Sequence, residues 1–130
     1  MSYGALPRPD PTGQPQRVVL LIEDDEAVRR SIQLLLHWRG YDVRSFGSAG
    51  PVLDGDSIRD VDILVTDYRL PDGDGIGILR ALRRSGWKGK AILITAFPSV
   101  ALIESARASG FDAVLEKPLR QHELVGALAD

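Results

Sequence analysis

The chain has 130 residues, and its 16 basic and 18 acidic side chains give a net charge of −2, so no bulk positive field attracts nucleic acid or an anionic membrane. It contains no cysteine, which excludes disulfides, thiolate metal sites and a cysteine nucleophile. No apolar run approaches the roughly 20 residues of a membrane span, and we expect one soluble, cytoplasmic domain.

The start of the chain differs in composition from the rest. Four of the eight prolines lie in the first 16 residues, which have no periodic apolar face to bury. We therefore expect residues 1–16 to form a disordered N-terminal tail and residues 17–130 to form the folded domain.

Along the rest of the chain, five short aliphatic runs alternate with five stretches of helical periodicity. The predicted strands are Val18–Ile22, Val43–Phe46, Ile63–Thr66, Ala91–Thr95 and Ala113–Leu115. The predicted helices are Glu26–Arg39, Ser48–Ile58, Asp74–Arg84, Ser99–Ser109 and Gln121–Ala129. This alternation predicts an α/β fold, with a doubly wound, five-stranded parallel sheet and helices on both faces.

Polar residues stand at or just after the ends of four predicted strands. They are the run Glu23–Glu26, then Asp67, Thr95, and Lys117 with Pro118. Each of these alone is typical of a helix start, a turn or a loop. In a parallel sheet, however, the carboxyl ends of the strands lie at one edge, where polar function gathers. We therefore expect these residues to form one site.

The residue types favour phosphoryl chemistry on a carboxylate. Carboxylates that lie close together repel one another unless a cation neutralises them, and an open edge with only oxygen ligands suits Mg²⁺. Lys117 can pair with such carboxylates at rest and with a phosphoryl group on its arrival, and Thr95 supplies a hydroxyl donor. A carboxylate nucleophile, a divalent metal, a lysine and a hydroxyl together predict aspartyl-phosphate formation.

Four sequence motifs resemble the receiver domain of two-component response regulators. They are LLIEDDE at 20–26, DILVTDYRLPDGDG at 62–75, ILITA at 92–96 and LEKPL at 115–119, and the resemblance covers residues 17–129. It implies the flavodoxin-like strand order 2-1-3-4-5. It also implies a signalling domain that catalyses its own Mg²⁺-dependent phosphorylation and dephosphorylation, rather than a turnover enzyme.

The resemblance implies a Mg²⁺ site around the phosphoacceptor, Asp67. Asp24 and Asp25 would form the acidic pair, with Asp25 a direct ligand and Asp24 acting mostly through water. The backbone carbonyl of Arg69 would be the remaining protein ligand. Glu23 replaces the aliphatic residue that commonly precedes the pair, and we expect its side chain to point into solvent, because an unneutralised buried charge is costly.

The resemblance also assigns the residues that contact the phosphoryl group. Thr95 would be the switch hydroxyl, Lys117 would bind the phosphoryl oxygens, and the Lys117–Pro118 bond is expected to be cis.

The implied donor is a phosphohistidine on a sensor histidine kinase or a histidine phosphotransfer protein. A homodimer through the face of the fourth helix, fifth strand and fifth helix is a further expectation, and this segment is not expected to bind nucleic acid or membranes.

Val114 departs from the family pattern, which usually has an aromatic residue three positions before the lysine. In the family, that ring moves when the switch hydroxyl is drawn toward the phosphoryl group. Valine has no ring and one stiff rotamer preference. We therefore expect the switch to run through Thr95 and the loop 96–98, with movement of Phe97 or of the backbone in place of the ring.

Three alternative functions are weighed against this one. A flavodoxin-like cofactor binder would need phosphate donors after the first strand, where this chain has an acidic run that repels phosphate. A metal-dependent phosphatase of similar chemistry would carry a second aspartate two residues after the nucleophile, where Arg69 stands. A degenerate receiver, acting as a phosphorylation-independent binding module, is the remaining alternative, although every expected phosphorylation residue is present.

Overall fold

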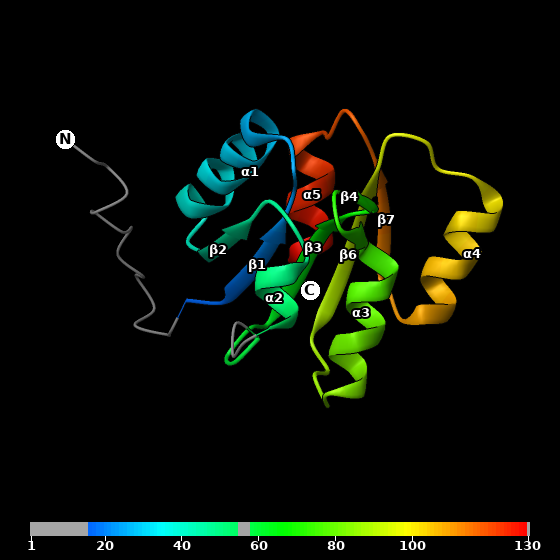
Figure 1. Cartoon of the computed structure of the whole chain (residues 1–130). Helices are drawn as coiled ribbons and strands as arrows, with labels where there is room; N and C mark the ends of the chain where they lie inside the picture. The colour runs from blue at the N-terminus through cyan, green and yellow to red at the C-terminus, as the bar shows by residue number, and fades with distance from the viewer. Residues whose placement is uncertain (1–15, 55–57, 130) are drawn as a thin grey trace.

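The computed structural model describes residues 16–54 and 58–129, so the predicted tail, except for Gln16, lies outside the described residues. The described chain forms three layers, with a central sheet and helices against both of its faces (Figure 1). Among the described helices, none combines the length and the apolar character that crossing a membrane requires.

The sheet has five parallel strands in the order β2-β1-β3-β6-β7, which is the predicted order 2-1-3-4-5 when these strands alone are counted. Their bounds are β1 (Val18–Ile22), β2 (Asp42–Phe46), β3 (Ile63–Asp67), β6 (Lys90–Thr95) and β7 (Ala113–Glu116). The prediction of a doubly wound α/β fold is therefore confirmed.

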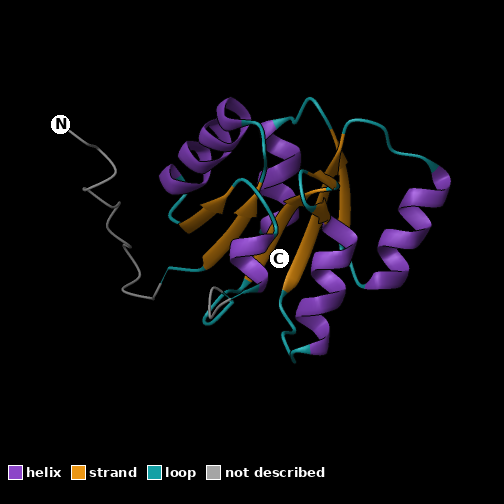
Figure 2. Ribbon diagram, viewed as in Figure 1, coloured by secondary structure: helices purple, strands orange, loops and turns teal. Residues whose placement is uncertain are grey.

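Five helices cover the two faces of the sheet. Their bounds are α1 (Glu26–Trp38), α2 (Gly50–Leu53), α3 (Gly75–Arg84), α4 (Val100–Ser109) and α5 (Gln121–Leu128). Ile32 from α1 and Leu124 from α5 lie in one apolar core with Leu21 of β1. Leu79 from α3 lies in the other core with Leu20. Accordingly, α1 and α5 pack on one face, and α2, α3 and α4 on the other (Figure 2).

The central strands are apolar throughout because both of their faces are covered. Every residue of β1 and β3 is buried, as is typical of strands in a parallel sheet between helices. Successive residues alternate between the two cores, since side chains of a strand point to opposite faces in turn. The same alternation therefore predicts to which face of the sheet the side chain of the residue after a strand points.

Three helices begin with a side chain that accepts a backbone N–H from three residues later. These caps are Asp25 for α1, Asp74 for α3 and Ser99 for α4. Helix α4 thus starts after Ser99 as predicted, and Gly110 ends it in the left-handed conformation, with a φ of 109° that glycine adopts without strain.

Helix α2 is shorter than the sequence predicts. It spans Gly50–Leu53 instead of Ser48–Ile58, and residues 55–57 lie outside the described residues. Pro51 stands in its first turn, where a proline fits because its missing N–H has no partner within the helix. The element therefore amounts to a single turn.

A small hairpin follows β3, between the predicted strand Ile63–Thr66 and the predicted helix Asp74–Arg84, where the sequence pattern predicts no strand. Strands β4 (Arg69–Leu70) and β5 (Gly73–Asp74) pair antiparallel and form a separate two-stranded sheet. Strands of two residues are too short to carry a hydrophobic period, so the sequence pattern does not distinguish them from a loop.

Candidate functional site

Three charged residues continue the strands on one face of the sheet. Glu23 follows β1, Asp67 ends β3 and Lys117 follows β7. The residues at alternate positions before them, such as Val19 and Leu21 before Glu23, lie in the core against α1 and α5. Because the strands are parallel, these three side chains meet at the carboxyl edge of the sheet.

Lys117 joins the two acids. Its Nζ lies 2.7 Å from Glu23 Oε1, and it donates a hydrogen bond of 2.9 Å to Asp67 Oδ2. Burial alone would lower the pKa of Lys117, but the hydrogen bonds to Glu23 and Asp67 outweigh burial and raise this pKa above its usual value. Lys117 is therefore a fixed positive charge between two buried carboxylates.

The expectation that Glu23 points into solvent is wrong. Its side chain is completely buried, and its Oε2 accepts the Asp25 N–H at 3.1 Å. Lys117 supplies the opposite charge that a buried carboxylate needs. Desolvation raises the pKa of Glu23 to about 7, although Lys117 and the Asp25 N–H lower it. A sequence signal for this orientation exists, because Glu23 is two positions beyond Leu21 and so shares its face.

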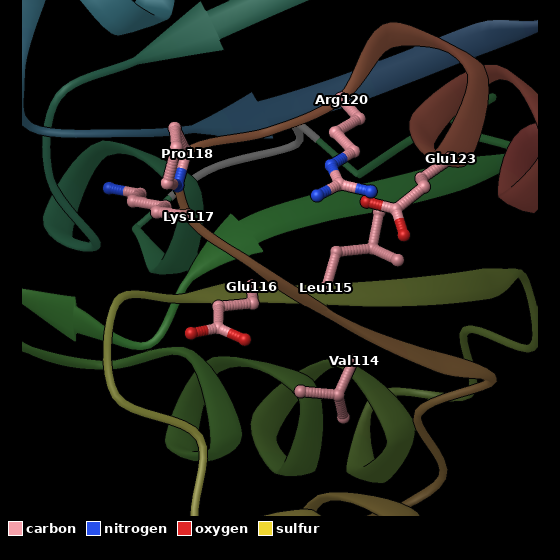
Figure 3. Close-up of a pocket in the computed structure, with 7 residues that line it drawn as sticks. All are labelled: Val114, Leu115, Glu116, Lys117, Pro118, Arg120 and Glu123. Atoms are coloured by element: carbon pink, nitrogen blue, oxygen red, sulfur yellow. The ribbon is translucent and has the colours of Figure 1, made fainter.

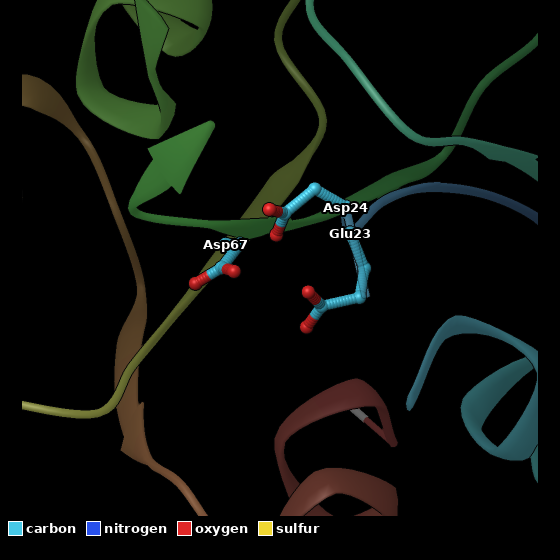
Figure 4. A group of neighbouring side chains, drawn as sticks. All are labelled: Glu23, Asp24 and Asp67. Carbon is cyan, nitrogen blue, oxygen red and sulfur yellow. The ribbon is translucent and has the colours of Figure 1, made fainter. Parts of the chain in front are cut away.

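Glu23, Asp24 and Asp67 form a carboxylate cluster (Figure 4). Each offers one oxygen, and these oxygens all lie within 4.8 Å of one another. Asp24 is exposed, whereas the other two are buried. An all-oxygen donor set with an excess of negative charge, open to water on one side, is the chemistry that suits Mg²⁺. The residues present therefore fit a magnesium ion.

Asp25, the expected direct ligand, lies at the start of α1 and not in this cluster. Its Oδ1 accepts the Val28 N–H at 3.1 Å, which caps the helix. The pairing of β1 with β2 extends one residue past the strand, because the Glu23 N–H donates to the Phe46 carbonyl at 3.0 Å. The chain turns into α1 only after that, so Glu23, and not Asp25, lies with Asp24 in the carboxylate cluster.

Thr95 lies at the end of β6 and is buried. Its Oγ1 accepts the Phe97 N–H at 3.2 Å, and its carbonyl accepts the Lys117 N–H at 2.8 Å. The second of these bonds joins the end of β6 to the segment that carries the lysine. The Lys117–Pro118 bond is cis, as predicted.

The backbone after Asp67 turns at Gly75, where no side chain fits. The Gly75 N–H donates to the Tyr68 carbonyl at 2.8 Å. A Cβ on Gly75 would lie 2.6 Å from Asp67 O and 2.8 Å from Leu93 Cδ1, closer than real Cβ atoms approach. The intervening β4–β5 hairpin contains Arg69, whose carbonyl is an expected metal ligand and whose side chain is exposed.

A hollow of about 490 Å³ lies along β7 and the start of α5 (Figure 3). It is lined by Val114, Leu115, Glu116, Lys117, Pro118, Arg120 and Glu123. Val114 is half-buried and packs against the core on the α3 and α4 face, where the family pattern would have an aromatic ring. Phe97, on the neighbouring loop after β6, is 81% exposed.

Comparison with known sequences points to one family. The sequence model described as "Response regulator receiver domain" matches residues 19–129. The transcriptional regulatory protein TrcR of Mycobacterium tuberculosis is 35% identical over 136 residues, covering 96% of this chain and 49% of that protein. The cell cycle response regulator CtrA of Brucella ovis is 32% identical over 112 residues, covering 85% of this chain and 47% of that protein. The chain thus spans about half the length of these curated relatives.

Comparison with solved structures agrees. The crystal structure of FixJ-N is 30% identical with a TM-score of 0.78, covering 89% of this chain and 93% of that one. A receiver domain of an HD domain-containing protein from Pseudomonas fluorescens Pf-5 is 28% identical with a TM-score of 0.80, covering 88% and 93%. A CheY-like receiver domain from Methanospirillum hungatei JF-1, at 24% identity and a TM-score of 0.82 over 88% and 92%, shares the fold.

Proposed function

This chain belongs to the receiver domains of response regulators, and from that premise we propose that Asp67 accepts a phosphoryl group in a Mg²⁺-dependent reaction. The observation that carries the proposal is a buried Asp67 carboxylate, 2.9 Å from Lys117 Nζ, within a cluster that includes Glu23 and Asp24. Receiver domains interact with histidine kinases or histidine phosphotransfer proteins, so a phosphohistidine of such a partner is the donor. The residues for phosphoryl chemistry are all present, which does not support a degenerate receiver.

The metal ligands in this proposal are the carboxylates of Asp24 and Asp67 and the backbone carbonyl of Arg69. Glu23 is the second acid of the pair, and Asp25 caps α1. When bound, Mg²⁺ supplies the positive charge that lets an anionic phosphoryl group approach these carboxylates.

The transfer itself is a displacement at phosphorus. A carboxylate oxygen of Asp67 attacks the phosphorus atom of the phosphohistidine, an O–P bond forms, and the P–N bond breaks with its electron pair leaving on the histidine nitrogen. Lys117, no longer facing an ionised Asp67, pairs with the phosphoryl oxygens, and Thr95 Oγ1 donates to another of them. Hydrolysis of the acyl phosphate by water returns Asp67 to its carboxylate.

Intact mass spectrometry after incubation with acetyl phosphate and Mg²⁺ tests this function. We expect one phosphoryl group on the parent and none on Asp67→Asn or after chelation of the metal. Asp42→Asn is the matched control, since Asp42 is exposed and begins β2 at the opposite end of the sheet, and it should be labelled as fully as the parent. Equal labelling of D67N and the parent would overturn the assignment.

The ligand assignment makes a separate prediction for Asp24 and Asp25. In a Mg²⁺ titration followed by amide NMR, Asp24→Ala should weaken binding at least roughly tenfold, because it removes a ligand. Asp25→Ala should lower stability by about 1 kcal/mol through loss of the helix cap, and change Mg²⁺ affinity much less. Equal losses of affinity would mean that general electrostatics, and not ligation, explains binding.

We further propose that the face formed by α4, β7 and α5 mediates a homodimer, and that the output lies in a partner or in further sequence. Phe97 precedes α4 and Val100 is its first residue, and both support an interface because they are apolar and 81% and 74% exposed. Sedimentation with and without beryllofluoride measures the association. A monomer under both conditions would contradict the dimer.

A further inference from the structure

Asp72 makes two hydrogen bonds that the proposed chemistry does not use. It lies in the turn between β4 and β5. Its Oδ1 accepts the Ala49 N–H and its Oδ2 accepts the Gly50 N–H, both at 2.8 Å. These N–H groups stand at the start of α2, where a helix leaves its first amides without internal partners. The bonds lower the pKa of Asp72, so its carboxylate is ionised at neutral pH.

This contact spans the carboxyl end of β1. Asp72 follows β3 and Ala49 follows β2, and β1 lies between those two strands in the sheet. The residues directly after β1 are Glu23 and Asp24, whose carboxylates face Asp67 (Figure 4). The hairpin and the β2–α2 loop are therefore tied together across the strand end that carries the acids.

Apart from the bonds of Asp72, the tip of the hairpin has little contact with the core. Within residues 69–74, Leu70 alone is half-buried and packs against the core, while the other five residues are exposed. At the base, the Gly75 N–H donates to the Tyr68 carbonyl. A two-stranded hairpin is marginal by itself. Its last residue, Asp74, caps α3 by accepting the Gly77 N–H, and at its tip the bonds of Asp72 hold it to the β2–α2 loop.

We propose that Asp72 is a positioning residue for the metal site. It fixes the β4–β5 hairpin against the β2–α2 loop and so orients the Arg69 carbonyl toward the carboxylate cluster. This inference rests on the proposed function, in which the Arg69 carbonyl is a ligand of Mg²⁺. Asp72 itself does not contact the metal, and it acts through the hairpin.

A Mg²⁺ titration of the full chain followed by amide NMR tests the inference with two variants, Asp72→Ala and Asp72→Asn. Both remove the same negative charge, but asparagine keeps one oxygen that can accept the N–H of Ala49 or Gly50. We expect D72A to weaken Mg²⁺ binding roughly tenfold, which corresponds to about 1.4 kcal/mol, and D72N to weaken it less. Where D72A does not fold, Asp72→Ser, with a shorter hydroxyl acceptor, replaces it.

The Leu70 amide gives a second readout, because its N–H belongs to the same peptide unit as the Arg69 carbonyl. We expect Mg²⁺ to shift this amide in the parent and to shift it less in D72A. Equal weakening in D72A and D72N would reveal an effect of charge alone and overturn the proposal. Unchanged affinity in D72A, with lower stability in urea, would also overturn it, because Asp72 would then only stabilise α2.

The same titration separates this inference from the proposed function. A parent that binds no Mg²⁺, or an Asp24→Ala variant that binds as tightly as the parent, contradicts the proposed metal site and with it the role of Asp72. A parent that binds Mg²⁺ and loses it in D24A, but not in D72A, contradicts the role of Asp72 alone.

Discussion

Glu23 and Lys117 form an ion pair in which the side chain of Glu23 is completely buried. Lys117 Nζ lies 2.7 Å from Glu23 and also pairs with Asp67, so one ammonium compensates two carboxylates. Burial penalises the charged form of Glu23, and the nearby Asp67 adds to this, which together raise the pKa of Glu23 to about 7. The charge of the site in the absence of metal therefore changes near neutral pH.

Glu23→Gln should remove part of the pH dependence of stability. A carboxyl with a raised pKa binds more protons in the folded than in the unfolded state between its ordinary value of 4.5 and about 7, so the free energy of unfolding falls as pH rises through this window. We expect this group to lower the free energy of unfolding of the parent by about 3 kcal/mol across the window, and we expect no such decrease in E23Q. Urea unfolding at about pH 5 and about pH 8 without Mg²⁺ measures the difference.

Glu26→Gln is the matched control for that measurement. Glu26 is exposed and pairs with Arg30 at 3.4 Å along α1, an arrangement that contributes little to stability. E26Q should keep the pH dependence of the parent. If E23Q also keeps it, the raised pKa does not belong to Glu23.

At the scale of single residues, the sequence predicts some of the site well. Asp67 and Lys117 are identifiable because each lies within two residues of the end of an aliphatic run, and the structure brings their charged atoms within 2.9 Å. The roles of the residues in the acidic run after β1 are harder to assign from the sequence, because Glu23, Asp24 and Asp25 are chemically alike. Which of them faces the cluster depends on where the strand turns into the helix, a boundary of one residue that composition does not reveal.

The turn from β3 into α3 requires glycine at position 75. Gly75→Ala would press a Cβ against Asp67 O and Leu93, so we expect it to lower the free energy of unfolding by about 1–3 kcal/mol. Because Asp67 O belongs to the backbone of the proposed phosphoacceptor, phosphorylation should also slow. Urea unfolding and the rate of labelling by acetyl phosphate measure both effects.

Gly77→Ala is the control for the same helix. The nearest atom to a Cβ at Gly77 is Asp74 Oδ1 at an ordinary 3.6 Å. Replacing an exposed helical glycine by alanine without strain stabilises by about 0.4–1 kcal/mol, so G77A should match or exceed the parent in stability. A G75A variant as stable as G77A would contradict the close approach at Gly75.

Among the elements, those with a clear hydrophobic period were predictable and those without one were not. The five strands of the sheet match the aliphatic runs to within a residue or two. Helix α2 has one turn, and the capping of its first amides by Asp72 comes from a distant segment. The β4–β5 hairpin is defined by two residue pairs. Such features depend on tertiary contacts that a local pattern does not contain.

For the molecule as a whole, the parallel sheet brings residues that are distant in the sequence together at one edge. Lys117 and Asp67 are 50 residues apart in sequence and directly hydrogen-bonded. The strand order itself came from the resemblance to the family, because alternation of strands and helices predicts a parallel sheet but leaves its order open. The same sheet edge joins the site to α4, since Thr95 ends β6 and the Phe97 N–H donates to its hydroxyl.

Movement of Thr95 should therefore reach the α4, β7 and α5 face through Phe97. In the parent, beryllofluoride with Mg²⁺ should shift amides along that face as well as at the site, because the Phe97 N–H donates a hydrogen bond to Thr95 Oγ1 and the Phe97 side chain is exposed. Phe97→Ala should keep labelling by acetyl phosphate and reduce the shifts on the face. Val100→Ala, which truncates a 74% exposed side chain nearby, should keep them. Parent shifts confined to the site would show that Val114 interrupts the path.

An aspartyl phosphate on Asp67 would lie at a sheet edge that also carries Glu23 and Asp24. Reduction of the phosphorylated chain with borohydride converts an aspartyl phosphate to homoserine, and peptide mass spectrometry then locates it. We expect homoserine at position 67 alone, dependent on Mg²⁺ during phosphorylation. Homoserine at position 24, or a phosphoryl group that resists this reduction, would contradict it.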